Sequence, residues 1–222
     1  MHILIINSSP RTPSLSNTTM IINAFEKGVV KAGATVETYN LANKKQWEDI
    51  KKSFISNENI VFALPLYIET LPGIMLEFLE ELAIYLKKVT NAISINRKIS
   101  FILQSAFPEA CQRRCCENYL KTIPKFLNSS FTGILSHGDT FNLSFVESTK
   151  MNTLASYELM GQKFIENNAT FFFKECLDFT GAEYFSEAEA KKYNRLLKFF
   201  CQHIAEGKGC TGRLTDAPYE IK

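Results

Sequence analysis

The chain has 222 residues, of which 45% are hydrophobic and 12% aromatic, and its 25 Lys and Arg against 23 Asp and Glu leave a formal net charge of +2. This composition excludes an intrinsically disordered chain, and the near-neutral charge gives no electrostatic case for a nucleic-acid or membrane-surface binder. No apolar run approaches the roughly 18 residues that a membrane span needs. The N-terminal residues lack the basic region and cleavage site of a secretory signal. We therefore expect a soluble, cytoplasmic protein.

Short apolar runs recur along the chain and predict strands. The first, residues 3–6, is apolar at every position, which is typical of a strand buried on both faces of a parallel sheet. The expected strands are residues 3–6, 35–39, 60–64, 99–104 and 130–135.

Helical spacing of apolar residues separates and follows these runs. The expected helices are residues 17–31, 44–52, 72–87, 109–127, 151–174 and 186–205. We expect Gly33 to stop the first helix and Pro124 to bend or end the fourth. Ser186 followed by Glu189 is a capping box that starts the last one. Residues 208–222 show no periodicity and are expected to form an irregular tail.

The alternation of strands and helices predicts a single α/β domain over residues 1–222. We expect a doubly wound, five-stranded parallel sheet of order 2-1-3-4-5, with right-handed crossovers that place helices on both faces. Ligands of such sheets bind outside the carboxyl ends of the strands. The loops after the first, third and fourth strands are therefore the places to seek a site.

The first of these loops is rich in hydrogen-bond donors. It contributes the hydroxyls of Ser9, Ser16 and Thr18, the amide of Asn17 and the guanidinium of Arg11, and it opens a helix whose N-terminus favours a phosphate. It has neither a dinucleotide-binding glycine motif nor a Walker A motif, so ATP or GTP hydrolysis has no support. The alternative is a loop whose hydroxyls only cap the helix.

The second and third loops carry weaker signals. Tyr67 stands after a buried strand, where it would cover a planar ligand or pack under the next helix. Phe107 and its small neighbours would border an aromatic ring system, or form an ordinary turn into the helix that begins near Glu109. The three loops lie at one edge of the predicted sheet, so together they indicate a ligand site more specifically than any one of them does alone.

Three segments resemble the flavin loops of the flavodoxin-like NAD(P)H-dependent FMN reductase family. They are residues 8–11 with 16–18, residues 65–67 with 71–72 and 78–80, and residues 107–110 with Gln112 followed by 133–135. The resemblance covers roughly the first two thirds of the chain. Some relatives are iron–sulfur flavoproteins, but this chain has no cysteine before Cys111, so that branch does not apply.

The resemblance implies a flavin site and a reaction. The FMN phosphate would be held by Ser9, Arg11, Ser16, Asn17 and Thr18. The ribityl chain and ring would be lined by Pro65, Leu66, Tyr67 and Ile68. The polar edge of the ring would be bordered by Ser105, Ala106, Phe107 and Glu109. Hydride would pass from NADPH or NADH to FMN and on to a quinone, flavin, azo or nitro acceptor in a homodimer or homotetramer, with no catalytic side chain required.

Two other classes remain open. A flavodoxin-like electron carrier or flavin-binding module would hold FMN without a nicotinamide site of its own, although such carriers are usually strongly acidic. A flavodoxin-fold protein without FMN would be a binding or regulatory domain. In the resemblance, Ala106 stands where glycine is usual, and residues 136–139 replace a glycine-rich run.

Some residues outside these loops also allow two interpretations. Cys111, Cys115 and Cys116 lie close together without a C-x-x-C pair, which favours small core residues over a metal site. His137 would be a hydrogen-bonded structural residue or touch a substrate. Trp47 would pack on the sheet edge or form a partner surface. Residues 171–173, all phenylalanine, cannot all face inward from one helix, so they predict either a subunit interface or a helix between two layers.

Overall fold

The computed structural model describes residues 1–89, 96–144 and 146–209. The chain divides into two compact units, Met1–Ala182 and Glu183–Lys222. The first unit contains the sheet and every segment considered below as part of a binding site. In the described part of the chain, no helix has both the length and the apolar character to cross a membrane.

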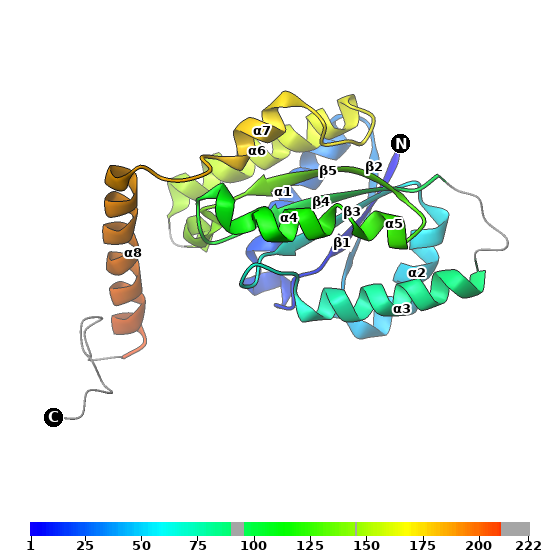
Figure 1. The fold of residues 1–222 in the computed structure, drawn as a ribbon, viewed down its shortest axis with the longest axis horizontal. Helices are drawn as coiled ribbons and strands as arrows, with labels where there is room; N and C mark the ends of the chain where they lie inside the picture. Colours follow the sequence, from blue (N-terminus) through cyan, green and yellow to red (C-terminus); the bar gives the residue numbers. More distant parts are fainter. Residues whose placement is uncertain (90–95, 145, 210–222) are drawn as a thin grey trace. The chain divides into compact units, whose positions relative to one another are not determined.

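A five-stranded sheet, parallel throughout, forms the centre of the first unit, in the order β2-β1-β3-β4-β5 (Figure 1). This confirms the predicted fold class and strand order. The strands are β1 (His2–Asn7), β2 (Thr35–Asn40), β3 (Asn59–Pro65), β4 (Lys98–Gln104) and β5 (Ser130–His137). Every residue of β3 is buried, as expected of a central strand covered on both faces.

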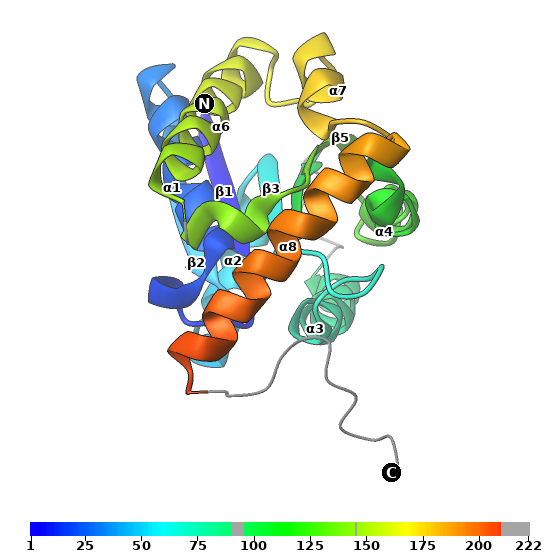
Figure 2. The ribbon, with the colours of Figure 1, turned by 90° about the vertical axis from the view of Figure 1, so that its left-hand side faces the viewer.

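On one face of the sheet, α1 (Asn17–Lys31) packs against α6 (Glu147–Glu166) (Figure 2). Two glycines allow the backbones to touch. A Cβ on Gly28 would lie 1.8 Å from the carbonyl oxygen of Glu158, and a Cβ on Gly161 would lie 2.2 Å from that of Phe25. This contact fixes the first helix, and with it the loop that precedes it, against the sheet.

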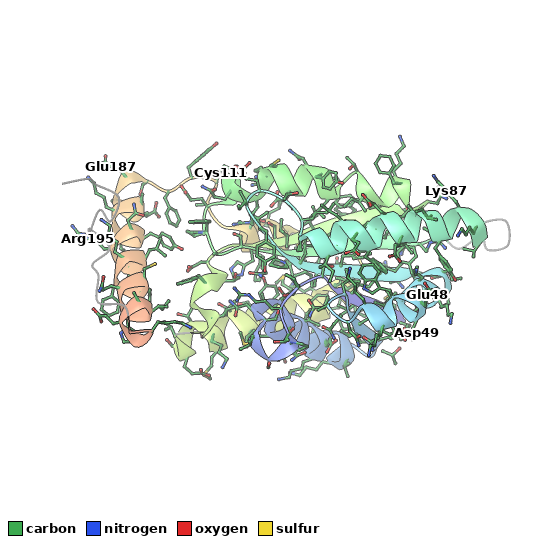
Figure 3. All side chains as sticks on the ribbon, turned by 90° about the horizontal axis from the view of Figure 1, so that it is seen from below. Glu48, Asp49, Lys87, Cys111, Glu187 and Arg195 are labelled. Atoms are coloured by element: carbon green, nitrogen blue, oxygen red, sulfur yellow. The ribbon has the colours of Figure 1, made fainter. Side chains whose placement is uncertain are left out.

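The opposite face carries α2 (Trp47–Ser56), α3 (Gly73–Val89) and α4 (Arg114–Leu120) (Figure 2), and the short α5 (Ile123–Phe126) packs into the same core. Trp47 is buried, donates from Nε1 to the carbonyl oxygen of Leu41 at 2.9 Å and meets the Phe78 ring edge-on. It therefore packs in the core rather than forming a partner surface. Glu48 and Asp49 lie in the first turn of α2, where the positive end of the helix dipole favours carboxylates (Figure 3).

The predicted helix 109–127 is divided into three pieces, which corrects the expectation for Pro124. A 3-10 turn, η3 (Ala110–Arg113), leads into α4, and α4 ends at Leu120. Pro124 lies in the first turn of α5, where its missing N–H leaves no hydrogen bond unmade. The proline therefore starts a short helix instead of bending or ending a long one.

The predicted helix 151–174 is also wrong at its C-terminal end. α6 stops at Glu166, and Asn168 and Ala169 both adopt the left-handed conformation. The chain is then extended before α7 (Lys174–Thr180), and Phe171 donates its N–H to the carbonyl oxygen of Thr132 at 2.8 Å. In this extended segment Phe171 is buried beside Gly133, while Phe172 is 66% exposed. The three phenylalanines thus alternate along a strand-like segment, and no single helix holds them.

The second unit contains α8 (Glu187–Gly207), none of whose residues is buried. The predicted capping box is confirmed, because Ser186 accepts from the N–H of Glu189 and the Glu189 carboxylate accepts from the N–H of Ser186. The irregular tail was predicted for residues 208–222, of which residues 210–222 lie outside the described residues. That residues 1–222 act as one domain stays a prediction.

Candidate functional site

A pocket opens at the carboxyl edge of the sheet, with about 540 Å³ of empty space that includes the region open to solvent. It is lined by Ser9, Arg11, Ser16, Asn17, Thr18, Pro65, Leu66, Tyr67, Gln104, Ser105, Ala106, Thr140 and Phe141. The structure thus brings residues of all three predicted loops around one cavity. Three of the predicted residues, Ile68, Phe107 and Glu109, do not line it.

The end of β1 sets the shape of the first loop. Asn7 is buried, and its Oδ1 accepts from the N–H of Ser9 at 3.0 Å. Its Nδ2 donates to Thr19 Oγ1 at 3.0 Å and to Asn40 Oδ1 at 2.8 Å. One amide therefore ties the loop, the first turn of α1 and the end of β2 together.

Two buried serines, Ser9 and Ser16, hydrogen-bond to each other and to the backbone of this loop. Ser16 is the N-cap of α1 and accepts from the N–H of Thr19 at 3.3 Å, while its hydroxyl donates to Ser9 Oγ at 3.0 Å. Ser9 Oγ also accepts from the N–H of Arg11 at 3.3 Å. Ser16 thus caps the helix, as the alternative interpretation expected, and it also lines the pocket.

A second network crosses the pocket floor. Gln104 Nε2 donates to Thr18 Oγ1 at 3.2 Å, and Gln104 Oε1 accepts from the hydroxyl of Thr140. Asn17 Nδ2 donates to the carbonyl oxygen of Thr140 at 2.8 Å. These contacts join the N-terminus of α1 to the end of β4 and to the loop after β5.

Sequence reasoning missed Gln104, Thr140 and Phe141. Gln104 is the polar last residue of an otherwise apolar strand, and that position is a usable signal. Thr140 and Phe141 follow β5, whose carboxyl end lies at the same edge as the other strands. The rule that ligands bind outside the carboxyl ends of the strands, applied to the fifth strand as well, would have found them.

The second loop contains a tight turn. Tyr67 and Thr70 exchange backbone hydrogen bonds of 3.1 and 3.2 Å around Ile68 and Glu69, which have φ values of 45° and 58°. A β-branched residue in this left-handed region is strained. Ile68 is also 92% exposed, so packing does not compensate for the strain.

The third loop is held by its own hydrogen bonds and from behind by Arg113. Ser105 donates its hydroxyl to the carbonyl oxygen of Phe107 at 2.7 Å and its N–H to that of His137 at 3.0 Å. Ala106, between them, lines the pocket, and Phe107 is 52% exposed. Arg113, which the sequence analysis did not single out, is completely buried beneath the loop.

His137 does not line the pocket. Its ring packs against Phe179 at 4.4 Å and Tyr157 at 5.6 Å between ring centroids. Burial, and then the charge of Arg113, lower the pKa of His137 to about 4. Within the described residues, neither its Nδ1 nor the Tyr157 hydroxyl has a hydrogen-bond partner. His137 thus fits the structural interpretation rather than the substrate-contacting one, but ring packing holds it and its Nδ1 makes no hydrogen bond to the described residues.

The cysteines of the fourth helical region have different environments. Cys116 is buried, and burial raises its pKa to about 12, so it behaves as a small core residue. Cys111 is half-buried and Cys115 is exposed, so the prediction that these cysteines are small core residues holds for Cys116 alone among the three. Across the described residues, no group of three or more His, Cys, Asp or Glu side chains is arranged to hold a metal ion.

The all-parallel order β2-β1-β3-β4-β5 and a pocket at the carboxyl edge define the doubly wound, flavodoxin-like class of α/β proteins. A family model described as a flavodoxin-like fold matches residues 1–132, and the chain belongs to this family. A search of curated proteins finds no match.

Solved structures with the same fold include several redox enzymes. An NAD(P)H:quinone oxidoreductase from Methanothermobacter marburgensis is 16% identical, with a TM-score of 0.56 over 74% of this chain and 96% of that one. An FMN-dependent NADH-azoreductase from Bacillus anthracis, solved in complex with FMN, is 15% identical, with a TM-score of 0.52 over 73% and 98%. A flavone reductase is 12% identical, with a TM-score of 0.55 over 78% of this chain but 66% of its own. At these identities the likeness establishes the fold.

Proposed function

We propose that the protein is an FMN-dependent oxidoreductase that passes hydride from NADPH or NADH through bound FMN to a quinone, flavin, azo or nitro acceptor. The observation that carries the proposal is the buried network at the carboxyl edge. It joins the N-terminus of α1 to the loops after β4 and β5 around one pocket.

The first loop suits a phosphate. Hydroxyls of Ser9, Ser16 and Thr18, the Asn17 amide and the Arg11 guanidinium face the same cavity as the N-terminus of α1. Of the described residues that line the pocket, none carries a carboxylate, and Arg11 carries a positive charge. This donor set favours an anion and fits the phosphate of FMN.

The opposite part of the pocket suits a planar ring. Pro65, Leu66, Tyr67, Ala106 and Phe141 offer flat or small apolar surfaces. Cofactor sites are commonly lined in this way, with a few polar groups that fix orientation. Contacts of Ile68, Phe107 and Glu109 with FMN stay predictions of the resemblance.

Bound FMN would supply the hydride and electron transfer. The residues of the chain would then bind and orient it: the first loop by its donors, and the second and third loops by covering the ring. An azoreductase and a quinone oxidoreductase share this fold, which supports the azo and quinone acceptors proposed.

The proposal includes a cytoplasmic location, as the sequence analysis expects, and a homodimer or homotetramer, which the resemblance supports. Light scattering during gel filtration would measure the oligomeric state. A single species with the mass of one chain would reject that part and leave the flavin site untouched.

A visible absorption spectrum tests the function. The purified protein is incubated with excess FMN, desalted and scanned, and NADH or NADPH is then added without oxygen. We expect retained flavin bands that bleach with at least one nucleotide. Retained bands that do not bleach would favour an electron carrier. A colourless protein that does not quench FMN fluorescence would exclude both flavin functions.

A further inference from the structure

Arg113 is the largest fully buried side chain in the first unit, with no exposed surface. It lies at the junction of η3 and α4. Its Nε donates to Ser136 Oγ at 2.9 Å, and one terminal nitrogen, Nη2, donates to the carbonyl oxygen of Thr180 at 2.5 Å. The side chain therefore joins β5 to α7.

The other terminal nitrogen, Nη1, points at the third loop. It lies 3.2 to 3.3 Å from the carbonyl oxygens of three consecutive residues, Phe107, Pro108 and Glu109. It also lies 3.5 Å from Ser105 Oγ. These contacts fall on both sides of Ala106, so the guanidinium sits directly behind the part of the loop that lines the pocket.

Within the described part of the chain, the charge of Arg113 has no direct ion-pair partner. Among the described residues, no carboxylate oxygen lies within the 4.0 Å that defines an ion pair with it. The buried Glu117 accepts from Ser136 Oγ and pairs with the neighbouring Arg114, so a serine separates it from Arg113. Burial lowers the pKa of Arg113, but an arginine remains charged throughout the physiological pH range.

A buried charge of this kind acts strongly on its surroundings, because the protein interior screens it less than water does. Arg113 therefore adds a positive contribution to the potential at the wall of the pocket formed by the third loop. A ligand group that gains negative charge at this wall is stabilised there.

We propose that Arg113 is a positioning residue for the third loop and that its charge favours the reduced form of the flavin bound in front of that loop. The first effect concerns the chain alone. The second rests on the proposed function, since it requires FMN in the pocket.

The positioning effect is tested on the protein without flavin. Hydrogen exchange is measured at the amides of Ser105, Ala110 and Thr140, which the third loop and its neighbours hold in hydrogen bonds. We expect exchange to be at least about tenfold faster in R113M. It should also be faster in R113K, because a lysine ammonium cannot make all the hydrogen bonds of the planar guanidinium group. The matched control is R114M, which removes the adjacent, exposed arginine and should leave these amides protected. Unchanged exchange in both Arg113 variants would overturn the positioning role.

The electrostatic effect is tested by the reduction potential of FMN-loaded protein. We expect R113M to lower the equilibrium constant for reduction by about tenfold, which is about 30 mV for a two-electron couple. R113K keeps the charge and should retain most of the wild-type potential. A potential in R113M equal to that of the wild type would overturn this effect.

The outcomes separate the two proposals. Wild-type protein that retains no FMN would overturn the proposed function and the electrostatic effect, while hydrogen exchange would still decide the positioning role. If R113M does not fold, R113K decides the positioning role and Glu117→Gln decides the electrostatic one. Glu117→Gln removes the negative charge that partly offsets Arg113, so we expect a higher potential, and an unchanged or lower one would overturn the effect.

Discussion

Both edges of the sheet are hollow, but they are built differently. The depression at the amino edge is the larger, with about 1070 Å³ of empty space against about 540 Å³ at the carboxyl edge. Its lining includes Met1, His2, Ser56, Glu58 and Lys98, which are exposed or half-exposed. The carboxyl pocket is lined by buried polar groups that hold one another in place.

This difference shows that volume alone does not identify a site in this molecule. Burying a polar group is costly unless it is hydrogen-bonded. At the carboxyl edge, Ser9, Ser16, Thr18, Gln104 and Thr140 are all buried and bonded around a cavity. Such an arrangement is preorganised for a ligand, whereas most groups of the amino edge already face water.

The largest expected effect comes from removing donors at the carboxyl edge. The double variant R11A/N17A should bind FMN at least about 100-fold more weakly, because hydrogen bonds to a charged group are worth about 1.5–3 kcal/mol each. Quenching of flavin fluorescence measures the affinity. The matched control is N57A/K98A, which removes the same two kinds of group from the amino edge and should bind FMN like the wild type. Equal losses in the two double variants would remove the distinction between the edges.

A smaller effect is expected from crowding the carboxyl edge. A Cβ on Gly138 would lie 2.4 Å from the carbonyl oxygen of Phe107 and 2.5 Å from Arg113 Nη1. Gly138→Ala should lower the free energy of unfolding by about 2–3 kcal/mol, as overpacking does. Gly73→Ala is the control, because no atom lies within 4 Å of its added Cβ. If urea unfolding gave the same stability for both variants, the third loop would move to accept the added Cβ at little cost, and this prediction would be wrong.

The sequence predicted the sheet and the three loops because these features follow from local patterns. Central parallel strands are nearly uniform apolar runs, and the capping box at Ser186 acts over one helical turn. Most of the predicted flavin residues therefore line one cavity. Their role as flavin ligands is still a prediction.

The parts that could not be predicted depend on contacts distant in sequence. Arg113 is charged and would be placed on a surface by composition alone. Its burial becomes possible only because the carbonyl oxygens of the third loop and of Thr180 converge on it. Similarly, Phe171 leaves the helical pattern because its N–H bonds to β5 and its side chain needs the space left by Gly133.

The pH dependence of stability should also distinguish the edges. The pKa of His137 is about 4 in the folded protein, below its ordinary value of 6.5, through burial and then the charge of Arg113. The unfolded chain therefore binds the proton more readily. The free energy of unfolding falls as the pH drops below 6.5, the pKa of the unfolded chain, and levels off near pH 4, the pKa in the folded protein. The expected loss is about 2 kcal/mol between about pH 7 and pH 5. Denaturant unfolding at several pH values measures it. His137→Gln should reduce the loss, while His2→Gln at the amino edge should retain it because His137 is intact; a loss that persists in His137→Gln would contradict this account.

The smallest effect is expected at the second loop. Ile68→Asn should stabilise the protein by about 0.5–1 kcal/mol, because asparagine tolerates the left-handed conformation better than a β-branched residue. Ile84→Asn, an exposed site within α3, should give no gain. Thermal unfolding measures both. A destabilised Ile68→Asn would show that the exposed isoleucine has a packing partner in solution.

The most direct test of the account compares FMN with riboflavin, which lacks the phosphate. Wild-type protein is titrated with each, and the quenching of flavin fluorescence gives both affinities. If the first loop and the N-terminus of α1 hold the phosphate, FMN should bind at least about 100-fold more tightly than riboflavin. Equal affinities, or no binding of either flavin, would contradict a phosphate site at the carboxyl edge of this sheet.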